Sequence, residues 1–339
     1  MSYYLSVFFV TAALSGVFTL AMTKISLKLK ITDKPTEERK IHKHPVPLLG
    51  GVAIFAAFFG VLAFARENLV AGELEYRHWI AFFIGALFIM IGGFLDDKYN
   101  LSPLKQLAFS VLAPICVIIG GVSIDKISNP LGGFFYFSSA FSALLIFTWL
   151  LGMMYTTKLL DGLDGLVTGV TAIGGFIIFL FTISAKYYQP DIALAALVLS
   201  AACLGFLVFN WHPARIFLGE GGSLLLGFIL GVLAIISGGK IAIALLVMGI
   251  PVLDLVWTIV RRLWAGRNPF KFSDKKHLHF RILDLGIGQR KTVLIYYALA
   301  SVFGVSALYL QSLGKMLAMI ILVLIMFFMV MVFSLKEKS

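Results

Sequence analysis

WIAFFIGALFIMIGGFLDDKYN, residues 79–100, holds the two features that decide the fold of this chain. Residues 79–95 form an apolar run without a charge, and two carboxylates, Asp96 and Asp97, follow it directly. A run of this kind is typical of a helix that spans a bilayer. The stretch therefore predicts a membrane helix that delivers two acidic side chains to its water-facing end.

Apolar runs of the same kind fill the rest of the chain. Of 339 residues, 60% are hydrophobic and only 13% are charged, and the mean hydropathy is +0.97; a soluble domain carries about a quarter charged residues. Because lipid forces backbone groups to bond within a helix, we expect one all-α polytopic membrane domain over residues 1–339, with about eleven transmembrane helices. The runs are 3–23, 47–65, 79–95, 106–120, 138–154, 168–185, 191–208, 223–237, 240–258, 293–311 and 315–334.

The distribution of Lys and Arg predicts the orientation. Most of the 28 Lys and Arg residues lie in loops after odd-numbered runs or in the C-terminal tail. By the positive-inside rule this side is cytoplasmic. We therefore expect a protein of the inner membrane whose N-terminus lies on the outer side and whose C-terminus lies in the cytoplasm. In one outer loop, residues 124–137, apolar residues flank Gly132-Gly133 and predict a small hairpin. Loops after even-numbered runs hold only Arg66, Arg77, Lys126, Lys186, Lys240 and Lys315.

Two other interpretations of the composition are weaker. The formal net charge of +11 could indicate a nucleic-acid partner. The basic residues lie in loops between apolar runs and not on one amphipathic face, so no nucleic acid is expected. Cys116 and Cys203 each lie inside an apolar run, which predicts buried side chains without disulfide or metal chemistry.

Acidic residues gather at the predicted cytoplasmic ends of the runs. Because acids are costly inside a bilayer, their common depth predicts a single site on the cytoplasmic face. Adjacent helical residues do not share a face, so Asp96 and Asp97 can serve different partners, one of them a metal. Taken alone, this pair also fits a solvated helix end. The acids at this depth are Asp96, Asp97, Asp161, Asp164, Glu220 and Asp254.

Two glycine-rich segments contain three of these acids. Residues 159–166, LLDGLDGL, place Asp161 and Asp164 on one face of a turn whose glycines let a ligand approach the backbone; the alternative is a pair of exposed turn acids. Residues 210–223, NWHPARIFLGEGGS, lead into a helix, so their glycines and serine predict a phosphate cradle at its N-terminus. Glu220 there adds an oxygen ligand suited to Mg²⁺.

Two basic inner loops complete the pattern. The largest contains His277 and His279, whose alternate spacing suits an extended loop that grips a diphosphate, and also Arg281. The first, residues 39–51, RKIHKHPVPLLGG, combines cations, two prolines and a Gly-Gly pair at a helix start. Carboxylates for a metal, glycine-rich helix starts and basic loops together predict phosphate chemistry, with the bilayer as the source of a second substrate.

In this order the motifs resemble the polyprenyl-phosphate N-acetylhexosamine-1-phosphate transferase family, over the whole chain. The family contains the enzymes that start O-antigen, common-antigen and wall teichoic acid synthesis, and the phospho-N-acetylmuramoyl-pentapeptide transferases. The eleven runs and the short His277-Leu278-His279 motif resemble the first branch. The resemblance implies transfer of N-acetylhexosamine-1-phosphate, with GlcNAc as the expected sugar, from a UDP-sugar to undecaprenyl phosphate, releasing UMP. It also implies Mg²⁺ or Mn²⁺ as cofactor, with a homodimer among the expected assemblies.

The resemblance further implies roles for individual residues. The expected catalytic carboxylates are Asp96, Asp97 and Asp161, of which Asp96 is expected to deprotonate or orient the lipid phosphate. The expected metal ligands are Glu220, Asp96 and Asp97. The expected substrate contacts are Lys43 and Asp164 near the nucleotide, Asn210, Phe217 and Gly219 at the uridine, and His277 and His279 at the diphosphate, with Arg281 beside them.

Some residues depart from the family pattern: Tyr155 and Lys158 stand in place of asparagines, Glu220 in place of aspartate, and Phe280 in place of a third histidine. Alternatives to the main interpretation therefore stay open. A muramoyl-pentapeptide transferase would use a larger donor, and an inactive relative would have lost turnover. A transporter of nucleotide-sugars or lipid-linked sugars would place polar residues near mid-membrane and not at one face. Direct attack on the β-phosphorus and a covalent two-step route both agree with the sequence.

Overall fold

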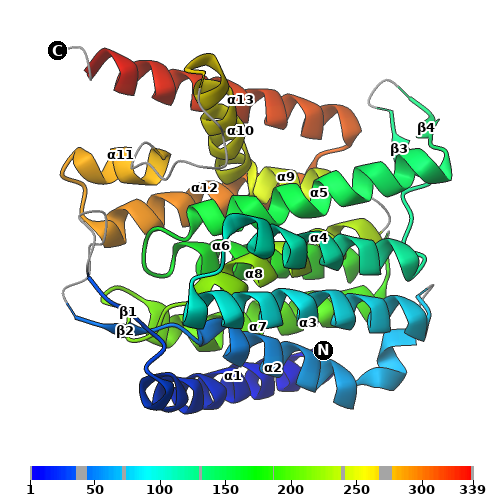
Figure 1. Ribbon diagram of the computed structural model, residues 1–339. Coiled ribbons are helices and arrows are strands. Elements are labelled where there is room, and N and C mark those ends of the chain that lie inside the picture. The colour runs from blue at the N-terminus through cyan, green and yellow to red at the C-terminus, as the bar shows by residue number, and fades with distance from the viewer. Residues whose placement is uncertain are drawn as a thin grey trace.

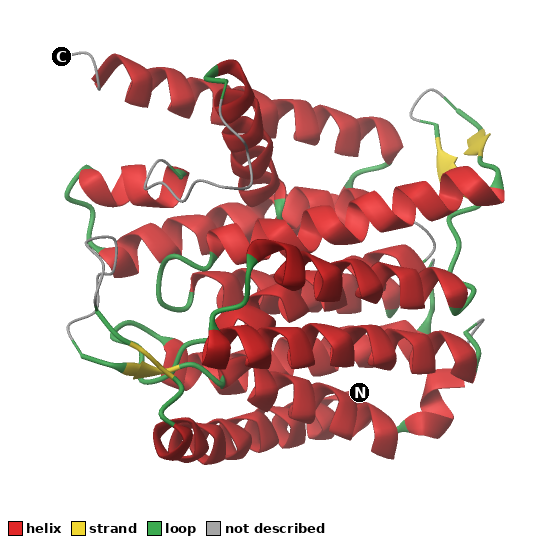
Figure 2. Ribbon diagram, viewed as in Figure 1, coloured by secondary structure: helices red, strands yellow, loops and turns green. Residues whose placement is uncertain are grey.

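Long helices that run side by side make up most of the molecule (Figure 1). The computed structural model describes residues 2–35, 44–70, 74–129, 132–185, 187–237, 241–266 and 277–336. Strands within these ranges form only two short antiparallel pairs (Figure 2), so the predicted all-α architecture is confirmed. The helices are α1 Ser2–Leu29, α2 Gly50–Phe64, η1 Arg66–Val70, α3 Tyr76–Tyr99, α4 Pro103–Ile119, α5 Ser139–Leu160, α6 Leu166–Thr182, α7 Pro190–Asn210, α8 Gly219–Ile236, α9 Ile241–Val247, α10 Gly249–Trp264, α11 Leu278–Asp284, α12 Gln289–Tyr309 and α13 Ser312–Lys336.

Each predicted apolar run coincides with one helix or, in one case, with two. Among the described helices, seven are long and apolar enough to cross a membrane, and there are eight such spans if the bent pair α9–α10 counts as one. Three shorter apolar helices, α2, α4 and α6, account for the remaining runs. The chain is therefore a polytopic helical membrane protein.

The run 240–258, predicted as one span, is broken into α9 and α10, whose axes differ by 82°. Pro251 explains the break, because proline has no N–H to donate to the carbonyl of Val247 one turn earlier, and its ring crowds that carbonyl. Gly249, the first residue of α10, adds backbone freedom at the same point. The second half of the run therefore leaves the direction of the first, and α10 stands across the neighbouring helices (Figure 1).

Helix α8 forms the centre of the bundle, where its residues are almost entirely buried. It packs against α3 and α5 and also contacts α2, α6 and α7. Glycines allow the closest approaches: a Cβ on Gly93 would lie 2.1 Å from Gly221 Cα, and one on Gly51 would lie 2.2 Å from Gly222 Cα. The backbones of α2, α3 and α8 therefore touch one another, which fixes the start of α8.

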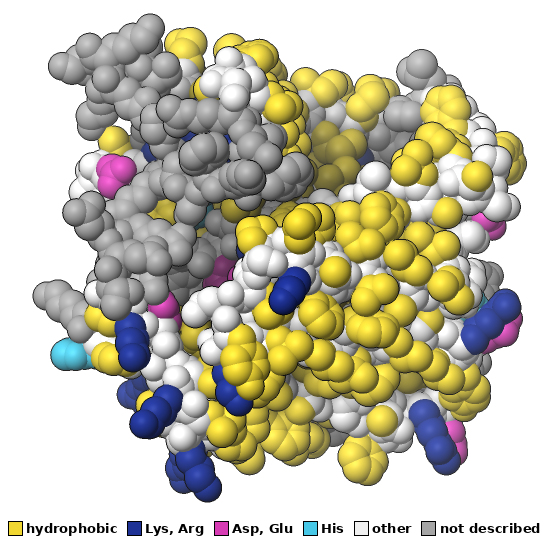
Figure 3. All heavy atoms as spheres, viewed as in Figure 1, with side chains coloured by type: hydrophobic (Ala, Val, Ile, Leu, Met, Phe, Trp, Pro, Cys, Tyr) yellow, Lys and Arg dark blue, Asp and Glu magenta, His cyan; other side chains and the backbone are white. Residues whose placement is uncertain are grey.

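The outer helices expose apolar side chains. Phe9 on α1, Phe64 on α2 and Phe328 on α13 are 66%, 95% and 63% exposed. Figure 3 shows a broad apolar surface across the middle of one face, with most of the Lys and Arg side chains on that face toward its left and right ends. An apolar surface of this extent is costly in water and suits lipid.

Two short hairpins mark opposite ends of the bundle (Figure 1). At one end β3 (Lys126–Ser128) pairs with β4 (Phe134–Tyr136), which confirms the hairpin predicted in residues 124–137. At the other end β1 (Thr32–Asp33) pairs with β2 (Val46–Pro47). The last turns of α3 and α5 and the first turn of α8 meet at the β1–β2 end, where most of the predicted site residues lie.

Candidate active site

Asp97, in the last turn of α3, holds the start of α8. Its Oδ1 accepts a hydrogen bond from the backbone N–H of Glu220 at 3.1 Å. Gly219 makes this approach possible: its φ is +74°, and a Cβ there would lie 2.5 Å from Asp97 Oδ2 and 2.2 Å from the Leu48 carbonyl oxygen. A carboxylate is favourable at this position because a helix N-terminus carries unpaired N–H groups and a positive dipole end.

Asp96 faces a different element. Its Oδ1 accepts hydrogen bonds from the Leu101 backbone N–H at 2.7 Å and from Gln106 Nε2 at 2.9 Å. Asp96 therefore connects the end of α3 to the first turns of α4, whereas Asp97 connects α3 to α8. The two neighbouring carboxylates thus contact different helices, and binding of a metal by one of them stays a prediction.

Lys158, in the last turn of α5, forms an ion pair with Glu220 in the first turn of α8. Its Nζ also donates to Gln106 Oε1 at 3.2 Å and lies 5.7 Å from the centre of the Tyr155 ring. Sequence reasoning identified Lys158 only as a departure from the family pattern and gave it no partner. Its distance of three residues from Asp161, on one helical turn, was the signal that it belongs to the acidic site.

Asp161 follows α5 directly and lies near two further carboxylates. Burial among protein atoms, then Glu220 and Asp164, raise the pKa of Asp161 to about 7. Asp161 lies at the surface of its turn, where the negative charges of Glu220 and Asp164 favour its protonated form. Asp97 in turn lies within electrostatic reach of Glu220 and Asp161. Asp97, Asp161 and Glu220, brought together from three elements, form what we call the acidic cluster.

Asp164 turns away from this cluster toward the segment before α8. Its Oδ2 lies 2.7 Å from His212 Nδ1 and accepts a hydrogen bond from the Ala214 backbone N–H at 3.1 Å. The His212 carbonyl oxygen accepts a hydrogen bond from Arg290 Nε at 3.0 Å. These bonds tie the turn after α5 to residues 212–214 and to α12. Sequence reasoning missed His212 and Arg290 as partners, because nothing in their local sequence points to Asp164.

Asn210, an expected uridine contact, is buried and binds protein atoms. Its Oδ1 accepts from the Gly165 backbone N–H at 3.1 Å and from Thr168 Oγ1 at 3.0 Å, and its Nδ2 donates to the Ile216 carbonyl oxygen at 3.0 Å. The Tyr297 hydroxyl donates to the Gly165 carbonyl oxygen. Asn210 therefore positions the two glycine-rich segments relative to each other.

The two histidines of the largest inner loop have different surroundings. His277 Nδ1 lies 3.1 Å from Asp254 Oδ2, and the next backbone N–H, of Leu278, donates to Asp254 Oδ1 at 3.2 Å. His279 is fully buried, and neither of its ring nitrogens has a hydrogen-bond partner among the described residues. It lies against Gly162, where a Cβ would be 2.5 Å from its Nε2. His279 therefore lies against the turn that carries Asp161 and Asp164.

Burial lowers the pKa of His279 to about 3, and the positive charge that His277 can carry acts in the same direction, while Asp254 opposes both. Its imidazole is therefore neutral, with one N–H free to donate.

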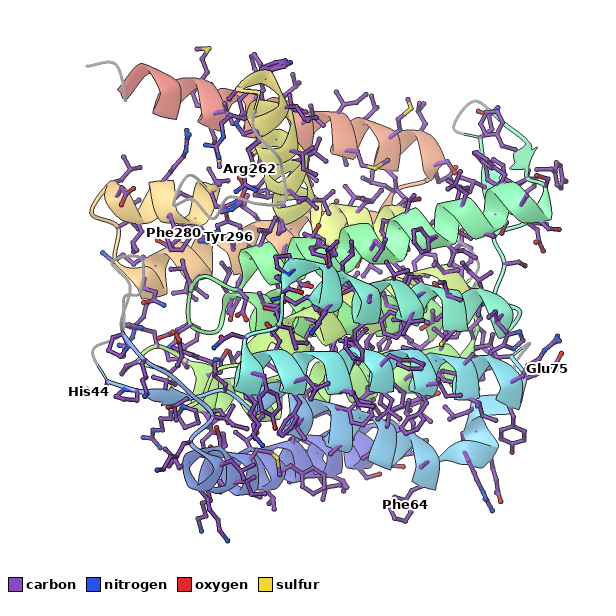
Figure 4. All side chains as sticks on the ribbon, in the orientation of Figure 1. His44, Phe64, Glu75, Arg262, Phe280 and Tyr296 are labelled. Carbon is purple, nitrogen blue, oxygen red and sulfur yellow. The ribbon has the colours of Figure 1, made fainter. Side chains whose placement is uncertain are left out.

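Phe280, which stands in place of a third histidine, packs on the His279 ring with centroids 4.3 Å apart. Figure 4 places Phe280 and His44 at the same end of the bundle, opposite Glu75. Arg281 lies in the last turn of the short helix α11.

The glycines of residues 219–222 do not form the predicted open cradle. Gly221 and Gly222 are buried against Gly93 and Gly51, and a Cβ on Gly222 would lie 2.6 Å from Gly51 Cα. This part of the prediction is wrong, because protein backbone occupies the space that a phosphate would need.

Phe217 is half-buried, and its backbone N–H donates to the Pro47 carbonyl oxygen at 2.8 Å. Lys43 and residues 39–42 of the first inner loop lie outside the described residues.

The carboxylates suit a divalent cation that brings other ligands with it. Within the described ranges, no group of three or more His, Cys, Asp or Glu side chains forms a ready metal cage. Mg²⁺ at phosphate-transfer sites uses one or two carboxylates together with phosphate oxygens and water. Of the predicted ligands, Asp97 and Glu220 lie next to each other, whereas Asp96 turns to Gln106. Asp97 and Glu220 therefore fit a cation that shares its coordination with a diphosphate.

Comparisons with known proteins identify the family of this chain. Residues 79–238, which include most of the site residues, match the model of "Glycosyl transferase family 4". A probable undecaprenyl-phosphate N-acetylglucosaminyl 1-phosphate transferase of Bacillus subtilis is 32% identical over 92% of this chain and 86% of its own length. A decaprenyl-phosphate N-acetylglucosaminephosphotransferase of Mycobacterium tuberculosis is 32% identical over 77% of this chain and 71% of its own.

A phospho-N-acetylmuramoyl-pentapeptide-transferase of Oceanobacillus iheyensis is a more distant relative, 28% identical over 90% of this chain and 95% of its own length. The two N-acetylglucosamine-1-phosphate transferases named above are thus more similar to this chain in identity, and the Bacillus subtilis protein matches it over nearly its full length. With its membrane helices and its acidic cluster, this chain belongs to the polyprenyl-phosphate N-acetylhexosamine-1-phosphate transferase family.

Proposed function

We propose that the protein transfers GlcNAc-1-phosphate from UDP-GlcNAc to undecaprenyl phosphate and releases UMP. The observation that carries this proposal is the acidic cluster, in which Asp97, Asp161 and Glu220 meet beside Lys158 at one end of the bundle. Carboxylates and a cation grouped at the water-facing end of membrane helices suit the transfer of a charged phosphate group to a lipid. The names of the relatives support transfer of an N-acetylglucosamine phosphate group to a polyprenyl phosphate, which is undecaprenyl phosphate in the Bacillus subtilis protein.

In the proposed reaction, an oxygen of the lipid phosphate attacks the β-phosphorus of the UDP-sugar. A new P–O bond forms, and the bond from the β-phosphorus to the oxygen that bridges the two phosphorus atoms breaks. The bridging oxygen keeps the electron pair and leaves with UMP. Asp96 or Asp97 orients the lipid phosphate and accepts any proton it carries. His277 and His279, of which His279 lies against the turn after α5, donate hydrogen bonds to the diphosphate.

A divalent cation, Mg²⁺ or Mn²⁺, belongs to the proposal, with Asp97 and Glu220 as its protein ligands. When bound, it would neutralise charge on the diphosphate and on the departing UMP. Hard carboxylate oxygens in the acidic cluster support this choice of metal. Asp161 lies within electrostatic reach of both proposed ligands and adds negative charge that would attract the cation.

The proposal includes a topology of eleven spans with the acidic cluster on the cytoplasmic side. The eleven spans are the seven long helices, the three shorter helices α2, α4 and α6, and the pair α9–α10 taken as one span. Successive loops then lie on alternate sides of the membrane, and the loops rich in Lys and Arg fall on one side. Both substrates are then accessible: the soluble UDP-sugar from the cytoplasm, and the lipid phosphate from the adjoining bilayer. A homodimer is compatible with this arrangement.

The deciding experiment is an assay of the purified chain with UDP-GlcNAc, undecaprenyl phosphate and Mg²⁺. Release of UMP that depends on the lipid acceptor, with formation of undecaprenyl-diphosphate-GlcNAc, is the expected result. Excess EDTA should abolish turnover, and added Mg²⁺ or Mn²⁺ should restore it. Lipid-dependent turnover that persists in EDTA would refute the cation, and no turnover with any UDP-N-acetylhexosamine would refute the proposed function.

Donor choice distinguishes this function from that of the pentapeptide-transferring relatives. UDP-GlcNAc and UDP-N-acetylmuramoyl-pentapeptide are offered together at equal concentration, and the lipid products are identified by mass. We expect the GlcNAc product to dominate, since the Bacillus subtilis relative named for that activity is 32% identical to this chain and the pentapeptide-transferase is 28% identical. A dominant muramoyl product would reverse the assignment within the family.

A further inference from the structure

Lys158 places a positive charge among the carboxylates that the reaction is proposed to use. Its ammonium pairs with Glu220, which lies within electrostatic reach of Asp97 and Asp161. The side chains of Lys158 and Glu220 are 26% and 21% exposed, so both are largely shielded from water. An ion pair so shielded is stronger than one in bulk solvent. Lys158 is therefore a built-in counter-ion of the acidic cluster.

Several contacts hold the ammonium in this place. Gln106 Oε1 accepts from Lys158 Nζ at 3.2 Å, and Gln106 Nε2 donates to Asp96 Oδ1 at 2.9 Å, so the ammonium is connected to Asp96 through one amide. The Tyr155 ring centre lies 5.7 Å away, within range of a cation–π interaction. Glu220, meanwhile, is fixed through its backbone by Asp97. The fold therefore holds both members of the Lys158–Glu220 ion pair in place.

We propose that the Lys158 ammonium and a divalent cation are alternative partners of the Glu220 carboxylate, and that the donor diphosphate decides between them. An ammonium and a doubly charged ion on one carboxylate repel each other, so Glu220 cannot serve both fully. A diphosphate offers the ammonium new charge-assisted hydrogen bonds. When Lys158 moves to the diphosphate, Glu220 becomes a free ligand. This inference rests on the proposed function, in which Glu220 binds the cation.

The consequence is a coupling between cation and donor. The donor-free protein binds the cation weakly because Lys158 occupies Glu220, and UDP-GlcNAc strengthens cation binding by removing Lys158. By thermodynamic reciprocity, the cation strengthens donor binding by the same factor. Removing the ammonium removes the competition, so Lys158→Met should bind the cation tightly without any donor.

The test measures Mn²⁺ binding to the full-length protein in detergent, by the electron paramagnetic resonance signal of free Mn²⁺. It is run with and without UDP-GlcNAc, and without lipid acceptor so that no turnover occurs. Lys158→Met should bind Mn²⁺ at least about tenfold more tightly than the parent in the absence of donor, a change of about 1.4 kcal/mol. Lys158→Arg, which keeps the charge, should resemble the parent. Lys105→Met, which removes an exposed lysine beside Gln106, controls for net charge and should change the affinity less than about twofold.

Glu220→Gln separates this inference from the proposed function, and it does so even if Lys158→Met fails to fold. In the parent background, Glu220→Gln should weaken Mn²⁺ binding strongly with UDP-GlcNAc and hardly at all without it. An equal loss in both conditions, or no gain in Lys158→Met, overturns the competition while leaving Glu220 as a ligand. No loss in either condition removes Glu220 from the cation site and refutes both the ligand assignment and the inference.

Discussion

Asp96 and Asp97 are neighbours in the chain, yet each is positioned by a different element: Gln106 and Leu101 at the start of α4 for Asp96, and the Glu220 backbone N–H at the start of α8 for Asp97. An asparagine in either position keeps an oxygen that can accept the same hydrogen bonds and loses only the charge. We therefore expect Asp96→Asn and Asp97→Asn to fold, with turnover at least about a hundredfold lower, the usual scale for loss of a general base or charge stabiliser.

UMP release measures this effect, and size-exclusion profiles in detergent check the fold. Asp125→Asn is the matched control, because Asp125 is an exposed acid next to the β3–β4 hairpin at the opposite end of the bundle. Its turnover should equal that of the parent. Near-parental rates in both Asp96→Asn and Asp97→Asn would make this pair a solvated helix end without a catalytic role.

The buried His279 predicts a dependence of stability on pH. In the folded protein the pKa of His279 is about 3, below its ordinary value of 6.5. At a pH between about 3 and 6.5, the unfolded chain therefore binds a proton at His279 that the folded chain does not bind. Protonation therefore favours unfolding: the contribution of His279 is complete above pH 6.5 and is lost as the pH falls, by up to about 2 kcal/mol at about pH 5. His279→Phe removes this titration and should flatten the decline.

Thermal unfolding in detergent, followed by intrinsic fluorescence from neutral pH to about pH 5, measures the slope. His44→Phe is the control, since His44 is exposed at the same end of the bundle, and its slope should match that of the parent. An equal slope in His279→Phe and the parent would mean that His279 gains its proton while the protein is still folded.

At the scale of single residues, the sequence shows which residues lie in one site, but it does not show which partner each of them binds. Charged residues next to apolar runs are rare, so Asp96, Asp97, Asp161 and Glu220 could be assigned to one site from their positions alone. Partners are a different matter. The ion pair of Lys158 with Glu220 joins α5 to α8, and such a distant pair leaves no mark in a single sequence.

The turn between α5 and α6 depends on close packing against α11. Gly162 has His279 on one side, and a Cβ there would lie 2.5 Å from His279 Nε2 and 2.8 Å from Phe280 Cζ. Gly162→Ala should therefore push α11 away from the turn without disturbing the bundle. Because displacements of about 1 Å in a site can cost a hundredfold in rate, we expect turnover to fall at least about tenfold.

Gly152→Ala on α5 provides the comparison, since a Cβ there meets no described atom within 4 Å. Alanine also favours a helix over glycine by up to about 1 kcal/mol, so this variant should keep its turnover and unfold at the same or a higher temperature. Turnover of Gly162→Ala equal to that of Gly152→Ala would show that the contact between the turn and α11 is not needed for the reaction.

Helices were easier to predict than the way they meet. Apolar runs gave the positions of the helices because lipid leaves the backbone few other structures. The break between α9 and α10 was missed, since Pro251 lies inside an otherwise continuous apolar run and prolines are tolerated in membrane helices. Gly221 and Gly222 were assigned to a phosphate because glycines at a helix start serve both ligand approach and helix packing, and only the structure distinguishes the two.

For the whole molecule, the distribution of surface side chains connects fold and function. Apolar residues cover the middle of the face seen in Figure 3, and most of its Lys and Arg side chains lie toward the two ends. The acidic cluster belongs to one of these ends, together with the β1–β2 pair. A reaction between a soluble nucleotide and a membrane lipid needs its reacting groups at such a boundary, where the acceptor phosphate can meet the donor without crossing the bilayer.

The predicted orientation can be tested on α3, which begins at Tyr76 and ends at Tyr99, two tyrosines that are 50% and 61% exposed. In a background with Cys116 and Cys203 replaced by alanine, Tyr76→Cys and Tyr99→Cys are matched variants at opposite ends of one helix. If the acidic cluster is cytoplasmic, a membrane-impermeant maleimide should label Tyr76→Cys in right-side-out vesicles and Tyr99→Cys in inverted vesicles. Labelling in the reverse sense would move the site to the outer face, where no cytoplasmic UDP-sugar reaches it. Labelling of both from one side would mean that α3 does not cross the bilayer.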